Sequence, residues 1–163
     1  MIIDLRTIPK DGPKHFELCL EKGWWNPDNQ DDQIIDICTP IKTQIDIYKA
    51  GSKYVLEGNM CGSVSIRCDR CLMPYENEIK TDFKLFFTQS SQHGNKVEIE
   101  LLEDDLETGF INGEEMEMDD IFREQIYLSL PIKSLCKEGC KGLCPICGTD
   151  LNVQSCNCGK ERH

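Results

Sequence analysis

The chain has 163 residues, of which 39% are hydrophobic and 29% charged. That is enough for one domain with a real core, or for one domain plus a small appendage. No run of residues approaches 18 consecutive apolar positions, and the first residues lack the pattern of a secretory signal. We therefore expect a soluble intracellular protein with no membrane partner. A formal net charge of −11 makes it a poor non-specific binder of nucleic acid.

The first two thirds of the chain have the alternating pattern of β-strands. Residues 1–9 open with the short apolar segment IIDL, which can form an edge strand, and residues 10–33 are mixed. From 33 to 88, three β-branched stretches with period-two alternation predict long strands, separated by Gly51-Ser52 and by RCDRCLMP. Strands joined by short turns predict an antiparallel sheet.

The next segment predicts shorter strands and one helix. VEIELL, residues 97–102, is a strand candidate, and Asn112-Gly113 marks a turn after another. Apolar residues at helical spacing predict a helix over 119–129 that ends before Pro131. The predicted fold is α+β: an antiparallel twisted sheet or partial barrel over about 1–115, with the helix packed on it. We expect a β-rich body at 1–131 and a zinc-ribbon-like, zinc-binding tail at 132–163.

The negative charge is concentrated between residues 98 and 124. This segment holds twelve acids and one base, Arg123, so its charge of −11 equals that of the whole chain. Two interpretations stay open. The acids can form a solvated face that keeps the protein soluble, or they can converge on one face and bind basic ribosomal proteins.

The C-terminal tail carries six cysteines within 23 residues, spaced C-x3-C-x3-C-x2-C-x8-C-x-C. Such closely spaced thiols favour a metal site over disulfides in a chain without a secretory signal. The turn Cys144-Pro145-Ile146-Cys147-Gly148 can present two thiolates to one ion, and it favours zinc over an iron–sulfur cluster. One predicted metal site, within the tail, consists of Cys144, Cys147, Cys156 and Cys158.

A further pair, Cys68 and Cys71, lies far upstream at the end of a predicted strand. Three interpretations compete: a redox dithiol, an unligated structural pair, or half of a second metal site completed by Cys136 and Cys140. One or two zinc ions are therefore expected. The isolated residues Cys19, Cys38 and Cys61 are expected to be small buried apolar side chains.

No enzymatic motif is apparent. The three histidines are scattered, and the sequence contains no HExxH, P-loop, GxGxxG or Ser/His/Asp set. Closed sites of four cysteines are usually structural.

The segments RCDRCLMP, YLSLP and CxxxCxGLCPxCGxDLNxxxCxC occur in an order that resembles the YceD family of large ribosomal RNA subunit accumulation proteins. The complete tail is similar to the Gram-positive and clostridial type. The resemblance implies a non-enzymatic role in the bacterial cytoplasm, in 23S rRNA accumulation and large ribosomal subunit biogenesis.

Two kinds of partner are consistent with such a role. Precursor rRNA is expected to contact the bases near the cysteines (Arg67, Arg70, Lys137 and Lys141). Basic ribosomal proteins are expected at the acidic segment 98–124. The alternatives are a protein-interaction module without RNA contact and a thiol redox protein that uses Cys68 and Cys71.

Overall fold

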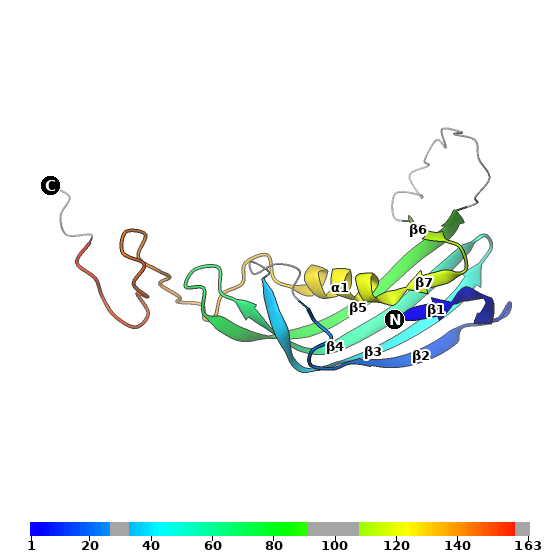
Figure 1. The fold of residues 1–163 in the computed structure, drawn as a ribbon, viewed down its shortest axis with the longest axis horizontal. Coiled ribbons are helices and arrows are strands. Elements are labelled where there is room, and N and C mark those ends of the chain that lie inside the picture. Colours follow the sequence, from blue (N-terminus) through cyan, green and yellow to red (C-terminus); the bar gives the residue numbers. More distant parts are fainter. Residues whose placement is uncertain (27–32, 91–107, 159–163) are drawn as a thin grey trace, which may run out of the picture. The chain divides into compact units, whose positions relative to one another are not determined.

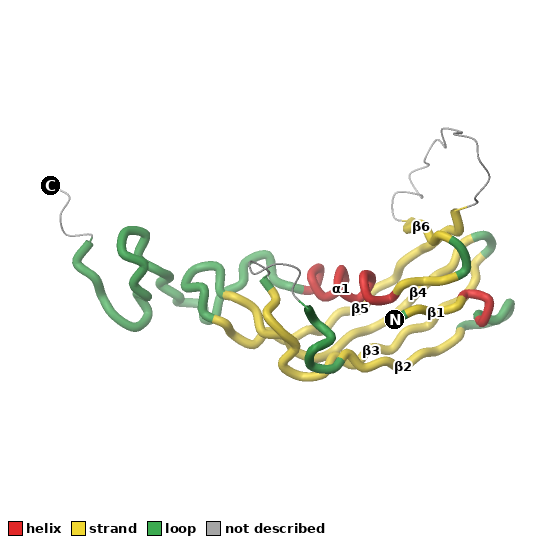
Figure 2. The backbone as a smooth tube through the Cα atoms, in the orientation of Figure 1, coloured by secondary structure: helices red, strands yellow, loops and turns green. Residues whose placement is uncertain are grey.

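The computed structural model describes residues 1–26, 33–90 and 108–158 (Figures 1 and 2). In chain order the elements are β1 (Ile2–Asp4), the 3-10 turn η1 (Leu5–Thr7), β2 (Lys14–Leu20), β3 (Ile34–Ala50), β4 (Lys53–Arg67), β5 (Pro74–Ser90), β6 (Thr108–Asn112), β7 (Glu115–Glu117) and α1 (Met118–Ser129). The protein is thus α+β, as predicted. Within the described ranges, no helix has both the length and the apolar character needed to cross a membrane.

The main sheet has five strands in the order β2-β3-β4-β5-β6, and β1 pairs with β7 in a separate antiparallel ribbon. The prediction of an antiparallel sheet is wrong at one edge, because β6 runs parallel to β5, with Phe86 opposite Thr108. A short turn would force two successive strands to be antiparallel. Residues 91–107 separate these two, and a parallel connection needs about a dozen residues. The predicted strand at 97–102 lies outside the described residues.

The long strands follow the predicted alternation. In β3 the side chains of Ile41, Thr43, Ile45 and Ile47 are buried, whereas those of Lys42 and Gln44 are exposed. Strand β2 was missed because residues 10–33 look mixed, although Phe16, Leu18 and Leu20 alternate within it.

The expectation that the three isolated cysteines are buried is wrong. Cys19, Cys38 and Cys61 are exposed, each on a strand next to a buried residue: Leu20, Ile37 and Met60 respectively. Because successive side chains of a strand point to opposite faces, a cysteine beside a buried residue faces outward.

Helix α1 forms where it was predicted, beginning one residue earlier. Met118, Phe122, Gln125 and Ile126 are buried, a spacing that places them on one helical face. Asp119 and Asp120 occupy the first turn, where carboxylates stabilise the positive end of the helix dipole. The N-terminal amine of Met1 forms an ion pair with the Asp119 carboxylate, and the Met1 carbonyl accepts a hydrogen bond from the Met118 amide at 2.9 Å.

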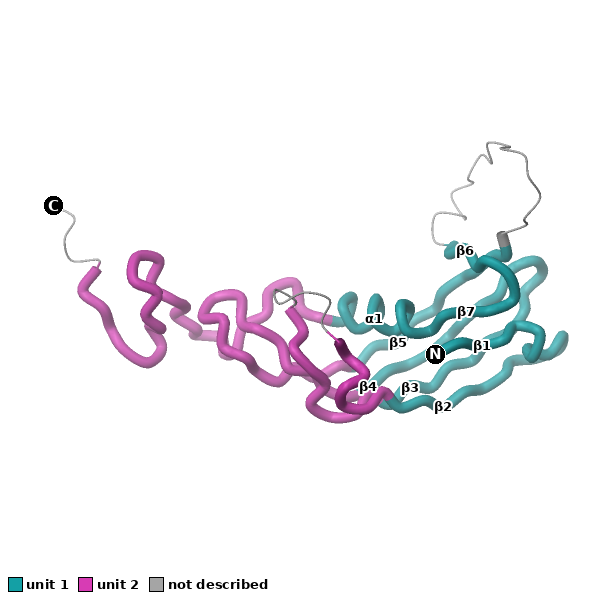
Figure 3. The backbone as a smooth tube through the Cα atoms, in the orientation of Figure 1, with its two compact units in different colours: residues 1–19, 42–61, 80–129 teal, residues 20–41, 62–79, 130–163 magenta. Residues whose placement is uncertain are grey.

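The chain divides into two compact units (Figure 3). Unit 1 comprises residues 1–19, 42–61 and 80–129, and unit 2 comprises residues 20–41, 62–79 and 130–163. The core of unit 1 includes Ile45, Leu56, Met60 and Phe122. All eight cysteines of the predicted metal sites belong to unit 2, in which residues 134–158 form loops and turns (Figure 2). The sequence boundary between 131 and 132 stays a prediction.

Candidate metal centres

The turn from β4 to β5 carries the upstream cysteine pair. The Cys68 amide donates to the Met73 carbonyl at 3.0 Å, and the Leu72 amide donates to the Cys68 carbonyl at 2.9 Å. These two bonds close a tight loop over residues 68–73. Leu72 adopts a φ of 60°, in the left-handed region, which reverses the chain directly after Cys71. Both thiols are buried.

Residues 134–140 are fastened to that turn by several hydrogen bonds. Ser134 is fully buried; its amide donates to the Asp69 carboxylate at 2.6 Å, and its carbonyl accepts from the Asp69 amide at 2.8 Å. The Ser134 hydroxyl accepts from the Gln33 amide group at 2.8 Å. The Arg70 guanidinium donates to the Cys140 carbonyl at 2.7 Å. These hydrogen bonds hold the segment that contains Cys136 and Cys140 next to the turn.

The resulting first cluster consists of Cys68, Cys71, Cys136 and Cys140, whose Sγ atoms all lie within 4.8 Å of one another. The sulfurs of Cys68 and Cys140 are 3.7 Å apart, and those of Cys71 and Cys136 are 3.6 Å apart. Four sulfurs at 2.3 Å from one zinc ion are about 3.8 Å from each other. The separations therefore fit a tetrahedral thiolate site. Apolar and aromatic side chains pack around it, among them Tyr75, Leu135 and Leu143.

The second cluster consists of Cys144, Cys147, Cys156 and Cys158, again with every Sγ within 4.8 Å of the others. Its first pair forms the same type of turn as the upstream pair. The Gly148 amide donates to the Cys144 carbonyl at 2.9 Å, and Gly148 adopts a φ of 71°. Here glycine occupies the left-handed position that Leu72 occupies in the first cluster.

Acid–base properties differ among the thiols of the first cluster. Burial raises the pKa of Cys68, but the backbone amides of Cys136, Cys71 and Arg70 outweigh it and lower that pKa to about 6. Burial and the neighbouring sulfurs raise the pKa of Cys136 to about 12. One thiolate therefore forms easily, and its negative charge opposes ionisation of the others. A divalent cation among the four sulfurs removes that repulsion.

The second cluster has the same division. The Thr149 hydroxyl, 3.2 Å from the Cys147 sulfur, helps to lower the pKa of Cys147 to about 6. The pKa of Cys158 is raised to about 12, mainly by the nearby Cys147 sulfur and to a smaller extent by burial. Both clusters thus offer the thiolate ligands that soft or borderline metal ions prefer.

Asn152, between Cys147 and Cys156 in the sequence, contacts the first cluster. Its side-chain nitrogen lies 3.5 Å from the Cys140 sulfur of the first cluster, and its side-chain oxygen accepts from the Lys141 amide at 2.9 Å. Gly142 adds a close backbone approach. Its φ is 76°, and a Cβ there would lie 3.0 Å from the Arg70 carbonyl oxygen. Ser134 lies outside the cysteine motifs, and although Asp69 and Asn152 stand within them, the spacing alone assigned neither residue a role at the clusters.

The structure brings together both sets of four cysteines that the sequence grouped. The four basic residues that are predicted to contact RNA are exposed and lie in the same unit: Arg67, Arg70, Lys137 and Lys141. Of the acidic segment, Glu114, Glu115, Glu117, Asp119, Asp120 and Glu124 are described, and the six acids at 98–107 lie outside the described residues.

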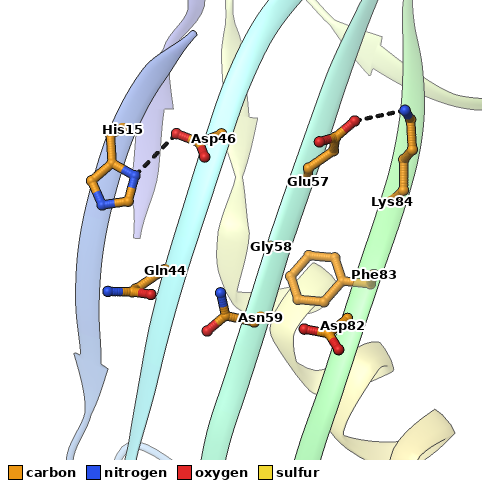
Figure 4. Close-up of a pocket in the computed structure, with 9 residues that line it drawn as sticks. All are labelled: His15, Gln44, Asp46, Glu57, Gly58, Asn59, Asp82, Phe83 and Lys84. Atoms are coloured by element: carbon orange, nitrogen blue, oxygen red, sulfur yellow. Dashed lines mark hydrogen bonds and ion pairs between the residues drawn. The ribbon is translucent and has the colours of Figure 1, made fainter.

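A polar hollow of about 640 Å³ lies on the outward face of unit 1, with α1 behind the strands (Figure 4). His15 lies 3.0 Å from Asp46, whose hydrogen bond raises the His15 pKa. Lys84 lies 2.6 Å from Glu57, which raises the Lys84 pKa. These charges pair within the face, so the hollow resembles an ordinary solvated sheet surface more than a site for a charged ligand.

Comparison with known proteins agrees with the cysteine pattern. The family model described as "Large ribosomal RNA subunit accumulation protein YceD" matches residues 56–163, a span that contains both clusters. A protein of Arabidopsis thaliana named "Large ribosomal RNA subunit accumulation protein YCED homolog 1, chloroplastic" is 26% identical over 145 residues, which cover 76% of this chain and 45% of that protein.

A Zea mays protein of the same name is 23% identical over 143 residues, covering 74% of this chain and 49% of that protein. The chain thus spans about half the length of the curated relatives that it matches. No solved structure matches it.

Proposed function

Since the chain belongs to the YceD family of large ribosomal RNA subunit accumulation proteins, we propose that it is a non-enzymatic factor for 23S rRNA accumulation and large-subunit biogenesis, acting in the bacterial cytoplasm. The clostridial subtype suggested by the complete tail stays a prediction. Support for a binding role comes from the two closed four-thiol clusters, because all-cysteine sites usually organise structure and leave no open position for a substrate.

We propose that each cluster holds one zinc ion, with Cys68, Cys71, Cys136 and Cys140 as ligands of the first and Cys144, Cys147, Cys156 and Cys158 as ligands of the second. When bound, zinc would act as a structural cross-link between chain segments. The redox alternative for Cys68 and Cys71 has less support, because their sulfurs lie against those of Cys140 and Cys136 as parts of one four-thiol site.

The observation that carries the RNA proposal is the contact between Arg70 and the Cys140 carbonyl. It joins the turn that contains Arg70 and directly follows Arg67 to the segment that contains Lys137 and Lys141. Basic residues from two distant parts of the sequence thereby belong to the segments that form the first cluster. A four-thiolate zinc site has a formal charge of −2, so RNA binding should be modest and salt-sensitive.

The test reverses charge without disturbing the cluster. Arg70 is kept, since its guanidinium supports the Cys140 carbonyl. We expect less precursor 23S rRNA to be recovered with the double variant Lys137→Glu/Lys141→Glu after crosslinking in cells. Binding of this variant to transcribed precursor in vitro should also depend less steeply on salt concentration. The matched control is Lys42→Glu/Lys80→Glu, which changes the same charge at two exposed strand positions. Equal recovery from both double variants and the wild type would refute the RNA contact.

A protein-interaction module without RNA contact is the second candidate function. The charge of −11 between residues 98 and 124 supports it, because ribosomal proteins are typically basic and opposite charge speeds encounter. Neutralising Glu103, Asp104, Asp105 and Glu107 to amides should then reduce the ribosomal proteins recovered by pull-down. If that yield falls while precursor rRNA recovery is insensitive to the lysine changes, the protein-interaction function is favoured.

A further inference from the structure

Leu72 has an unusual backbone conformation for its residue type. It is the one non-glycine residue with a positive φ among the described residues, at 60°. The equivalent position of the second cluster's turn is Gly148, at 71°. A left-handed conformation brings Cβ close to the following carbonyl oxygen, so leucine destabilises this turn relative to glycine. Strained residues of this kind persist where the surrounding structure imposes the conformation, and they cluster at functional and ligand-contacting sites.

The Leu72 side chain contributes little to the protein's own core. It is 59% exposed, and the next residue, Met73, is 55% exposed. Two neighbouring large apolar side chains therefore project from the loop that Cys68 and Cys71 anchor. We define Leu72 and Met73 as the apolar tip. The cost of holding leucine in this conformation has no compensation in burial within the described chain.

The surroundings of the apolar tip favour an anionic partner. Arg67 and Arg70 lie in or beside the same loop, and Lys141 follows Cys140, whose carbonyl contacts Arg70. The acid of the loop, Asp69, is engaged in a hydrogen bond with the Ser134 amide. An apolar tip flanked by basic side chains suits RNA with unstacked nucleobases. The phosphates would lie at the cationic side chains, and the face of a nucleobase would lie against the apolar side chains.

We infer that the apolar tip, Leu72 with Met73, contacts an unstacked base of the large-subunit rRNA precursor while the flanking arginines hold its phosphates. The inference rests on the proposed RNA-binding function and adds the chemistry of the contact. Leucine at position 72 thus trades fold stability for RNA contact. Glycine at that position gives the more stable turn and the weaker RNA binder.

The experiment uses full-length zinc-loaded protein and in vitro transcribed precursor 23S rRNA. For Leu72→Gly we expect a higher urea midpoint of unfolding and an RNA dissociation constant raised about tenfold. Its salt dependence should match the wild type, since the phosphate contacts remain. Leu72→Asn, which tolerates the left-handed region, should also weaken binding. Ile146→Ser, in the second cluster's turn and 62% exposed, is the control and should bind as the wild type does.

The outcomes separate this inference from the function on which it rests. If Lys137→Glu/Lys141→Glu loses RNA but Leu72→Gly and Leu72→Asn bind as the wild type does, the inference fails and the proposed function stands. If the wild type binds the precursor no better than the lysine variant, the proposed function itself fails. If Leu72→Gly keeps its RNA affinity but loses a protein in pull-down, the apolar tip binds protein and the inference is overturned.

Discussion

Among single residues, Asn152 makes several side-chain contacts beside the first cluster. Its side-chain nitrogen approaches the Cys140 sulfur at 3.5 Å and the Asp150 carboxylate at 2.7 Å, while its oxygen accepts from the Lys141 amide. An N–H donor stabilises a thiolate and fixes its orientation, as the outer contacts of metal ligands commonly do. Although Asn152 lies within the second cysteine loop, it thus supports a ligand of the first cluster.

Asn152→Ala should therefore weaken zinc binding selectively. Outer contacts of this type change metal affinity by about 10–100-fold, and we expect about tenfold for the first cluster, with the second unaffected. Chelator competition, which resolves the release of the two ions, measures both. Gln154→Ala alters an exposed side chain two residues away and should release both ions as the wild type does. Equal weakening of the two sites would show that Asn152 supports the tail in general and not Cys140 in particular.

At the scale of elements, α1 depends on one buried face. Phe122 is fully buried, whereas Leu128 on the same helix is 70% exposed. The carboxylates in the first turn and the bonds from Met1 tie the start of α1 to the N-terminus. Apolar burial on that face accounts for most of what holds the helix, because an isolated helix of 12 residues is marginal in water.

Phe122→Ala should destabilise the protein by about 3–5 kcal/mol, since it removes buried apolar area and leaves a cavity. Leu128→Ala makes a similar truncation on the exposed face and should change stability by no more than about 0.5 kcal/mol. Urea denaturation followed by circular dichroism measures both. Comparable losses from the two substitutions would mean that the helix is held by contacts other than its buried face.

At the level of the whole molecule, both four-cysteine clusters belong to unit 2. Both cysteine clusters fasten loops there, and residues 134–158 contain only an isolated bridge between Leu143 and Asp150 in place of regular strands. Such loops have little hydrogen-bonded secondary structure to hold them. The free energy of metal binding at the clusters would therefore stabilise the fold of this part of the chain.

Chelation of the zinc-loaded protein should consequently unfold one part and spare another. We expect amide exchange protection to fall in residues 68–73 and 134–158 and to persist in 45–60 and 118–126, where the core of unit 1 is apolar. Exchange measured by mass spectrometry reports both regions, and it also tests the predicted boundary between residues 131 and 132. Uniform loss of protection would show a single cooperative unit, and no loss would contradict a structural role for the metal.

Much of the local structure could be predicted because its cause lies within a few neighbouring residues. The alternation around Ile45 specifies which face of β3 is buried, and the spacing of Met118 and Phe122 specifies a helix. The turn at Cys144 is specified by its own proline and glycine. These are short-range effects of backbone geometry and side-chain period, so they can be derived from the sequence without knowledge of the fold.

Other features depend on contacts between segments that are distant in the sequence. The partnership of Cys68 with Cys140 joins positions 72 residues apart, and the sequence left it as one of three interpretations. It depends on the hydrogen bonds of Asp69 and Arg70 with Ser134 and Cys140, which no local sequence pattern pairs with them. The parallel direction of β6 likewise depends on the path of a long connection. In each case many chain paths satisfy the same local preferences, and only the packing of distant segments selects among them.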